Sequence, residues 1–261
     1  MKEQNLKKRI HLHIERIYST SLNETEILEF SDNIYNLIVS KKTLHSSPLL
    51  SDQWSEKTAV LITYANSITT TNNISPLSSL EKFVSSKCQK FIDTVHILPF
   101  FPSSSDDGFA VKDYYNVDDE FGDWKDIINI SKSFRVMADV VINHGSSEGV
   151  WFKNFIKGEG RGHDYFLSFD NTFDITEVVR PRTSPLLNTF DTHDGTRYLW
   201  CTFSKDQVDY NFNNPKVINE FVEIILYYLK MGITIFRFDA VAFLWKRIGT
   251  SCMNLEKTHE I

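Results

Sequence analysis

The chain has 261 residues, of which 41% are hydrophobic and 24% are charged, and its formal net charge at pH 7 is -6. This length can bury a sizeable core, and the negative charge excludes the basic surface of a nucleic-acid-binding protein. The three scattered cysteines indicate a reducing compartment, and the eight histidines do not have the spacing of a zinc site. Because the N-terminus has no apolar signal segment and no run approaches a membrane span, we expect a cytoplasmic protein with no cofactor, no bound metal, and no membrane or nucleic-acid partner.

The N-terminal region is predicted to be helical. Apolar residues recur there at intervals of four, four and three positions, as on one helix face: Leu6, Ile10, Ile14 and Ile17. Asn23 followed by Glu26 is typical of a helix start, and apolar residues continue at helical spacing after it. We therefore expect residues 1–55 to form an N-terminal helical segment.

Strands and helices alternate along the rest of the chain. The pattern predicts strands at 59–64, 93–98 and 135–142, and a fourth after Gly232. It predicts helices at 76–88 and 123–134, and a third that starts at Asn214-Pro215 and ends at Gly232. This alternation implies parallel pairing and a βα fold.

Four strands are half the number in a complete (β/α)8 barrel. We therefore expect residues 56–261 to form the first half of a TIM barrel, an α/β fold that is truncated after about strand four. The chain resembles the N-terminal half of a longer protein. Residues 145–202 lose periodicity and are rich in Gly and Pro, so we expect a loop-rich insertion after strand three, with a short helix near 151–156.

Two charged residues lie inside the apolar run that forms the predicted fourth strand. Arg237 and Asp239 are two positions apart, so on a strand their side chains point to the same face. A buried charge is costly unless it is paired, and an ionised carboxylate held by an Arg is what a nucleophile requires at neutral pH. A purely structural ion pair is the alternative.

The predicted third strand also ends in polar residues, Asn143 and His144. Barrel enzymes keep their chemistry at the carboxyl ends of their strands. Two strand ends about a hundred residues apart therefore carry candidate site residues.

These two strands resemble signature strands of the α-amylase superfamily of retaining α-glucosyl enzymes. The forms of 106–109 and 240–246 resemble the glucosylglycerate phosphorylase branch of that superfamily's sucrose phosphorylase group. Further motifs resemble the sucrose phosphorylase group as a whole. They are the runs 96–102, 105–109, 113–115, 180–182, 207–209 and 249–252. The resemblance extends from about Ala59 to Ile261.

The resemblance implies a role for several residues. Asp239 corresponds to the nucleophile that forms a glycosyl-enzyme, and Arg237 to the residue that holds it ionised and oriented. His144 corresponds to a residue that binds sugar hydroxyls, Asp106 to one that grips the far hydroxyls of glucose, and Gln207 to a further subsite residue. The alternative for Asp106 is that it only forms a turn, since Asp is a common turn residue. The alternative for Gln207 is a surface loop residue.

A phosphorylase also needs a cation for its anionic acceptor. Arg180 and Arg182 lie in the predicted insertion, and the resemblance places a comparable Arg-Pro-Arg loop near the acceptor subsite. Two solvated surface arginines are the alternative. Asn143 could be a calcium ligand, as in many amylases, although the sucrose phosphorylase group does not generally need a metal.

The resemblance implies a glucosyl phosphorylase that cleaves an α-glucoside, such as sucrose or glucosylglycerate, with phosphate to give α-glucose 1-phosphate. A hydrolase or transglucosidase of the same superfamily, or a non-catalytic truncated fragment, are the alternatives. The acid/base Glu and the third Asp lie beyond strand four in the family, and Glu260 follows Asp239 too closely to be that Glu. We therefore expect this chain alone to be inactive and poorly soluble, with a complementary C-terminal half as a partner.

Overall fold

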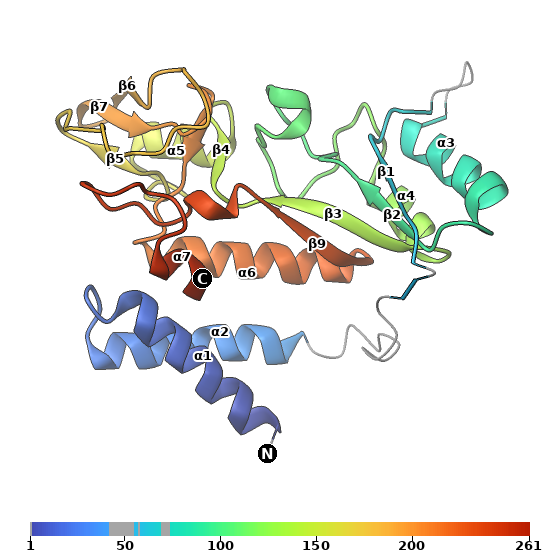
Figure 1. Cartoon of the computed structure of the whole chain (residues 1–261), viewed down its shortest axis with the longest axis horizontal. Helices are drawn as coiled ribbons and strands as arrows, with labels where there is room; N and C mark the ends of the chain where they lie inside the picture. Colours follow the sequence, from blue (N-terminus) through green and yellow to red (C-terminus); the bar gives the residue numbers. More distant parts are fainter. Residues whose placement is uncertain (1, 42–54, 57, 69–73) are drawn as a thin grey trace. The chain divides into compact units, whose positions relative to one another are not determined.

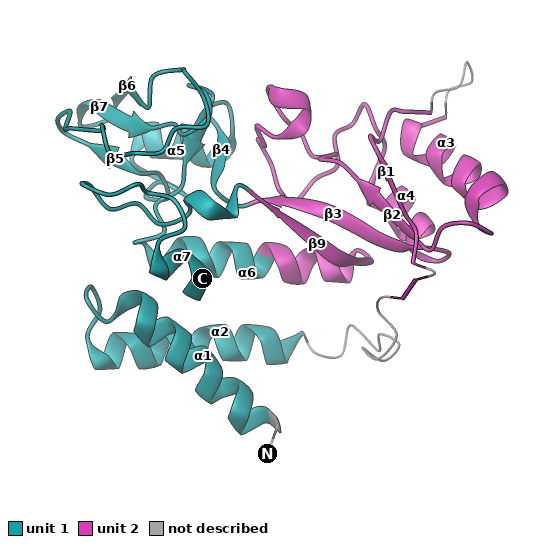
Figure 2. Ribbon diagram, viewed as in Figure 1, with its two compact units in different colours: residues 1–42, 142–223, 240–261 teal, residues 43–141, 224–239 magenta. Residues whose placement is uncertain are grey.

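A computed structural model describes residues 2–41, 55–56, 58–68 and 74–261. The chain divides into two compact units, which are coloured separately in Figure 2. Unit 1 comprises residues 1–42, 142–223 and 240–261, and unit 2 comprises residues 43–141 and 224–239. The chain crosses from unit 2 to unit 1 after residue 141 and again after residue 239, directly after a strand in each case.

Unit 2 is built on a four-stranded parallel sheet with the strand order β1-β2-β3-β9 (Figure 1). Its strands are β1 (Val60–Thr63), β2 (Thr94–Ile97), β3 (Arg135–Val141) and β9 (Ile233–Asp239). The four predicted strands and their parallel pairing are confirmed. The apolar run after β9 forms a short 3-10 turn at Val241–Phe243, because Ala240 adopts a left-handed conformation with φ of 60°.

Helices and aromatic side chains form the core of unit 2. Helix α3 (Pro76–Phe83) continues as a π-helical turn (Val84–Cys88), and α4 (Trp124–Ser131) begins at Asp123 with a capping box, as the sequence predicts. The ring of Phe101 stacks on that of Tyr228 at 5.1 Å between centroids, and both side chains are fully buried. Large aromatic contacts of this kind stabilise a core.

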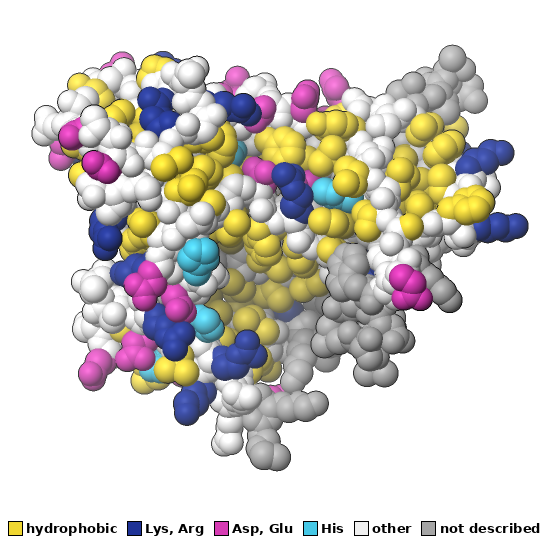
Figure 3. All heavy atoms as spheres, in the orientation of Figure 1, with side chains coloured by type: hydrophobic (Ala, Val, Ile, Leu, Met, Phe, Trp, Pro, Cys, Tyr) yellow, Lys and Arg dark blue, Asp and Glu magenta, His cyan; other side chains and the backbone are white. Residues whose placement is uncertain are grey.

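The two outer strands of this sheet are more exposed than the sequence predicts. The run that forms β9 is apolar enough to suggest a buried strand, yet only Ile233 is buried along it and Phe238 is 41% exposed. The prediction is wrong because β9 pairs only with β3 among the described strands and lies at an edge. Val60 and Ile62 are exposed on β1, the opposite edge, and Figure 3 shows hydrophobic side chains gathered over this unit.

Unit 1 contains the predicted N-terminal helices, α1 (Lys2–Tyr18) and α2 (Glu24–Ser40), which pack against each other. Asn23 and Glu26 form the predicted capping box, in which the Asn23 side chain accepts from the backbone N–H of Glu26 at 3.0 Å and the Glu26 carboxylate accepts from that of Asn23 at 2.8 Å. Residues 42–54 of the predicted helical segment lie outside the described residues.

The predicted insertion at 145–202 is more regular than expected. It contains helix α5 (Val150–Lys157), which confirms the predicted short helix. It also contains an antiparallel sheet in the order β5-β7-β6, built from Ser168–Phe169, Gly195–Trp200 and Leu187–Thr192. The expectation of a loop-rich segment is corrected, because β6 and β7 form a hairpin whose mixed polar and apolar faces leave no strong periodicity.

A second antiparallel pair in unit 1 joins β4 (His144–Ser146) to β8 (Gln207–Asp209). Helix α6 (Pro215–Lys230) follows and belongs to unit 2 from residue 224 onward. The Asn214 side chain caps its start by accepting from the backbone N–H of Lys216 at 3.0 Å. Helix α7 (Glu256–Glu260) ends the unit. None of the helices in the described part of the chain combines the length and apolar character that a membrane span requires.

Candidate active site

Arg237 and Asp239 meet at the carboxyl end of β9, as their spacing predicts. The guanidinium Nη2 of Arg237 donates to Oδ1 of Asp239 at 3.1 Å. The side chain of Arg237 is 42% exposed, whereas that of Asp239 is only 19% exposed. The pair therefore places a mostly covered carboxylate beside an Arg that solvent can reach.

Two further residues that the sequence analysis did not single out join this pair. Arg237 also donates from Nη1 to Oδ1 of Asp139, which lies opposite it on β3 and is fully buried. His96 on β2 lies with Nε2 at 2.8 Å from Oδ2 of Asp139. Asp139 is a charge inside an apolar run, the same signal that identified Arg237, so the sequence did contain an indication of it.

Burial dominates the electrostatics of Asp239. Its pKa is raised above the ordinary value, first because burial disfavours the charged carboxylate and then because the charges of Asp139 and Asp106 repel it. Arg237 acts in the opposite direction and lowers this pKa. The predicted help from Arg237 is present, but it does not outweigh desolvation.

Asp106 belongs to the same unit and lies in a tight turn. Asp106 and Asp107 adopt left-handed conformations, with φ of 56° and 49°, which Asp tolerates better than most residues. Gly108 follows with φ of 101°, and a Cβ at that position would lie 2.6 Å from the carbonyl oxygen of Pro99. The ring of Phe109 then lies 5.6 Å from the Arg237 guanidinium, so the turn reaches the charged cluster.

His144 and Gln207 are brought together in unit 1. They lie on the paired strands β4 and β8, where the side-chain amide nitrogen of Gln207 is 3.2 Å from Nε2 of His144. Both residues are buried, and the ring of Phe203 lies 5.0 Å from that of His144. Gln207 is therefore not the surface loop residue that remained an alternative.

A buried ammonium group occupies the surroundings of Asn143. Nζ of Lys246 donates to Oδ1 of Asn143 at 2.9 Å and lies 2.6 Å from Oδ2 of Asp209. The amide nitrogen of Asn143 donates to the same Asp209 carboxylate at 2.8 Å. The oxygen that a calcium ion would require from Asn143 is thus bound to Lys246, and burial lowers the pKa of that Lys. This geometry favours a structural role for Asn143.

The two candidate acceptor arginines differ in their surroundings. Nε and Nη2 of Arg180 are buried and have no hydrogen-bond partner among the described residues, whereas Arg182 is exposed. The backbone next to Arg180 is fixed, since the N–H of Val179 donates to the carbonyl of Ser251 at 2.9 Å. Buried guanidinium donors that are not used within the protein are suited to binding an anion.

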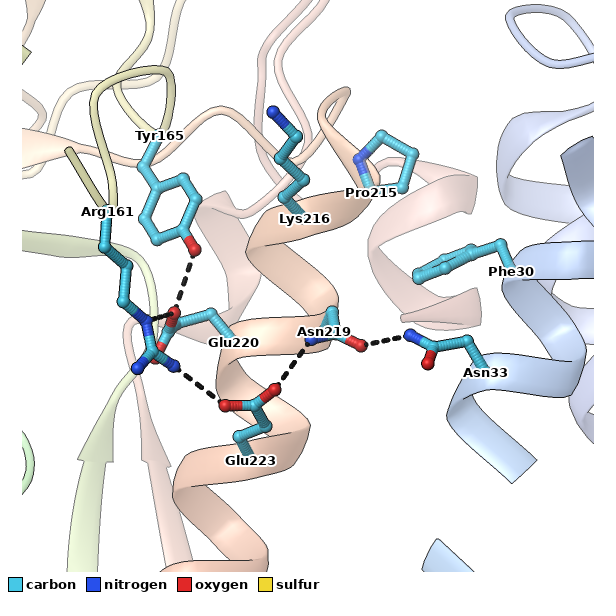
Figure 4. A pocket seen from close by; sticks show the side chains of 9 residues that line it. All are labelled: Phe30, Asn33, Arg161, Tyr165, Pro215, Lys216, Asn219, Glu220 and Glu223. Atoms are coloured by element: carbon cyan, nitrogen blue, oxygen red, sulfur yellow. Dashed lines mark hydrogen bonds and ion pairs between the residues drawn. The ribbon is translucent and has the colours of Figure 1, made fainter. Parts of the chain in front are cut away.

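A cavity of about 480 Å³ in unit 1 is lined by residues of α2, α6 and the segment after α5 (Figure 4). Arg161 donates to both carboxylate oxygens of Glu220 and to Glu223, each at 2.8 Å, and the Tyr165 hydroxyl also donates to Glu220 at 2.8 Å. These groups bond to one another, and none of them is a predicted site residue. We therefore interpret this network as stabilising the structure and not as a binding site.

Comparison with known proteins identifies a family for most of the chain. The family model described as "Alpha amylase, catalytic domain" matches residues 90–259. The match includes β2, β3 and β9, together with all seven predicted site residues.

Curated relatives and a solved structure agree with that match. The chain is 45% identical over 208 residues to a glucosylglycerate phosphorylase from Allomeiothermus silvanus, covering 80% of this chain and 37% of the relative. It is 38% identical over 260 residues to one from Escherichia coli, covering 98% and 45%. The crystal structure of a sucrose 6F-phosphate phosphorylase from Thermoanaerobacter thermosaccharolyticum superposes with a TM-score of 0.72 at 29% identity, covering 83% of this chain and 46% of that one. The chain therefore spans less than half the length of these proteins.

Proposed function

Because this chain belongs to the α-amylase catalytic-domain family, we propose that it forms the part of a retaining glucosyl phosphorylase that carries the nucleophile. The substrate would be an α-glucoside such as sucrose or glucosylglycerate, with inorganic phosphate as the acceptor. The observation that carries this proposal is the bond between Arg237 and Asp239 at the end of a parallel strand, in a chain similar to sugar phosphorylases.

In the first step, Asp239 attacks the anomeric carbon of the glucoside. A bond forms between a carboxylate oxygen of Asp239 and that carbon, and the bond from the carbon to the leaving-group oxygen breaks. A general acid protonates the departing oxygen. Glu260 is not suited to this role, because it is paired with His13 and Arg16 in unit 1.

In the second step, an oxygen of phosphate attacks the same carbon and displaces the Asp239 carboxylate. The product is α-glucose 1-phosphate, and two inversions give net retention of configuration. The proton that the phosphate oxygen loses passes to the conjugate base of the general acid.

Other residues are proposed to bind the reactants. Asp106 and His144 would bind glucose hydroxyls, and Gln207 would orient His144 through their contact. Arg180, whose buried donors lack a partner among the described residues, would bind phosphate or the anionic part of the glucoside, with Arg182 beside it.

The acid and the remaining strands of a (β/α)8 barrel are proposed to come from a complementary polypeptide segment, equivalent to the part of the relatives that this chain does not span. The exposed edge strands β1 and β9 are where such strands would pair. A cytoplasmic location is proposed because all three cysteines are free thiols.

The test is phosphorolysis by the intact protein with sucrose and with glucosylglycerate. We expect formation of α-glucose 1-phosphate, and its loss by at least about a thousand-fold in the Asp239→Asn variant. Asp107→Asn is the control: Asp107 is an exposed residue next to Asp106, and we expect this variant to keep its activity. Release of free glucose at saturating phosphate would favour a hydrolase, and unchanged phosphorolysis by Asp239→Asn would refute the mechanism.

A further inference from the structure

His96 is a buried histidine whose contact extends toward the proposed nucleophile. It lies on β2 and is only 3% exposed. Its Nε2 lies 2.8 Å from Oδ2 of Asp139, and a carboxylate at this distance accepts the ring N–H. One oxygen of a fully buried carboxylate is thereby fixed.

The sheet register places the members of this cluster on one face. His96 lies opposite Met137 in the pairing of β2 with β3, and Asp139 is two positions after Met137. Asp139 lies opposite Arg237, which is two positions before Asp239. Register partners and residues two apart share a face, so His96, Asp139, Arg237 and Asp239 project from the same side of the sheet.

Arg237 is shared between two carboxylates. It donates to the remaining oxygen of Asp139 and, with its other terminal nitrogen, to Asp239 at 3.1 Å. The planar guanidinium is rigid, so the position of Asp139 fixes the direction in which Nη2 points. If Asp139 rotated, Arg237 would turn with it and its bond to Asp239 would lengthen.

We propose that His96 is a positioning residue, which orients the nucleophile Asp239 through Asp139 and Arg237. This inference rests on the proposed function, since it assigns to Asp239 the attack on the anomeric carbon. His96 touches none of the reacting atoms, and its effect is transmitted by two hydrogen-bonded side chains. A displacement of about 1 Å at a nucleophile can lower a rate roughly a hundred-fold.

The experiment uses α-glucosyl fluoride, because fluoride leaves without protonation. Its release in the first turnover therefore reports the attack by Asp239 alone. Three single variants of the intact protein are compared with the wild type at equal concentrations of folded molecules, and Arg237→Lys is measured with and without His96→Leu. His96→Leu removes the donor, and His96→Gln keeps an amide N–H near the position of Nε2. Val95→Ala is the matched control, because Val95 is a fully buried neighbour on β2 that points to the opposite face.

We expect His96→Leu to lower the rate of fluoride release roughly ten- to a hundred-fold, with KM changed by less than about two-fold. His96→Gln should recover most of the rate, and Val95→Ala should lose stability without losing rate. In an Arg237→Lys background, His96→Leu should cause little further loss, because the connection is already broken.

Two results would overturn the inference while leaving the proposed function intact. One is a His96→Leu rate within about two-fold of the wild-type rate. The other is an effect of His96→Leu that multiplies independently with that of Arg237→Lys. An intact wild-type protein that releases no fluoride would instead overturn the proposed function. A crystal structure of His96→Leu decides the positional claim without activity, since an unchanged Arg237–Asp239 bond would contradict it.

Discussion

Arg237 on β9 lies directly opposite Asp139 on β3 in the parallel sheet, although 98 residues separate them in the chain. The guanidinium is therefore divided between a fully buried carboxylate and Asp239, the proposed nucleophile. Asp239 receives one hydrogen bond from Arg237, while burial and the neighbouring Asp139 and Asp106 act against its charge. The proposed nucleophile is held in place by a contact that does not compensate its desolvation.

The first prediction is that Asp239→Asn abolishes activity and yet stabilises the fold at neutral pH. Burial raises the pKa of Asp239 in the folded protein, so the ionised group destabilises the fold at any pH above both the folded and the unfolded pKa. This penalty declines as the pH falls through the raised pKa and vanishes below the unfolded value. The difference in Tm between the variant and the wild type should therefore be largest at neutral pH and disappear in acid.

The exposed Asp107→Asn variant is the control for that measurement, because it removes a carboxylate that is not buried, and its effect on Tm at neutral pH should be smaller than that of Asp239→Asn. A lower Tm for Asp239→Asn at neutral pH would mean that the pairing with Arg237 outweighs burial, which would contradict the electrostatic account.

The second prediction concerns the pH dependence of activity in the intact protein. Asp239 must be ionised to attack, so kcat/KM should fall as the pH drops through its raised pKa. The negative charge of Asp106 contributes to raising that pKa, and Asp106→Asn should therefore move the acid limb of the kcat/KM profile to lower pH. Asp107→Asn, one position along the same turn, should leave the limb in place.

The position of that limb is independent of the overall loss of activity that a sugar-binding residue would show. A profile of Asp106→Asn that is lowered everywhere but keeps its acid limb would mean that Asp106 binds sugar without influencing Asp239. A limb that moves to higher pH would contradict the assigned sign.

Local patterns were sufficient to predict much of this structure. Helix caps such as Asn23 and Asn214, and the spacing of Arg237 and Asp239, depend only on neighbours within a few positions. The parallel direction of the strands follows from the alternation of strands and helices. Features of this kind are visible in a single sequence because the same short segment contains both the cause and the result.

Contacts between distant segments could not be predicted in this way. The pairing of Asp139 with His96 and Arg237 depends on which strands are neighbours and on their register, and neither is encoded within one strand. Lys246 lies outside any helix or strand, so no periodicity identified its contact with Asn143 and Asp209. The hairpin of β6 and β7 was missed because no residue of β6 is buried and β7 is buried only at Leu199 and Trp200, so neither strand shows a regular alternation.

The third prediction concerns the buried ammonium of Lys246. Lys246→Met keeps the length and much of the volume of the side chain but leaves the fully buried Asp209 carboxylate without its cationic partner. Breaking a buried pair by removing one member costs about 3–5 kcal/mol. Urea-induced unfolding should therefore show a free energy of unfolding lowered by roughly this amount, with an unchanged dependence on urea.

Lys216→Met provides a matched control in the same unit. Lys216 is 62% exposed and pairs with Asp164 at 2.6 Å, and the loss of such a surface pair costs at most about 1 kcal/mol. Equal and small effects of the two substitutions would show that Lys246 is not the group that neutralises Asp209.

The fourth prediction is that Gly108→Ala disturbs the turn that carries Asp106. Gly108 has φ of 101°, and a Cβ would approach the carbonyl oxygen of Pro99 to 2.6 Å, so both conformation and space oppose any side chain. Because Asp106 and Asp107 already adopt left-handed conformations, the turn has little freedom to absorb the added methyl group. We expect a loss of about 1–3 kcal/mol in stability and a higher KM for the glucoside.

Gly249→Ala is the control that separates the conformational cost of a positive φ from the steric contact with Pro99. Gly249 also has a positive φ, of 76°, but nothing among the described residues lies within 4 Å of the position that a Cβ would take there, so only the conformational cost of about 1 kcal/mol applies. If the contact with Pro99 fixes the turn, Gly108→Ala should exceed Gly249→Ala in its effect on both Tm and KM. If Gly108→Ala and Gly249→Ala lower Tm equally and KM is unchanged, the contact with Pro99 does not fix the turn. The position of Asp106 then does not depend on Gly108.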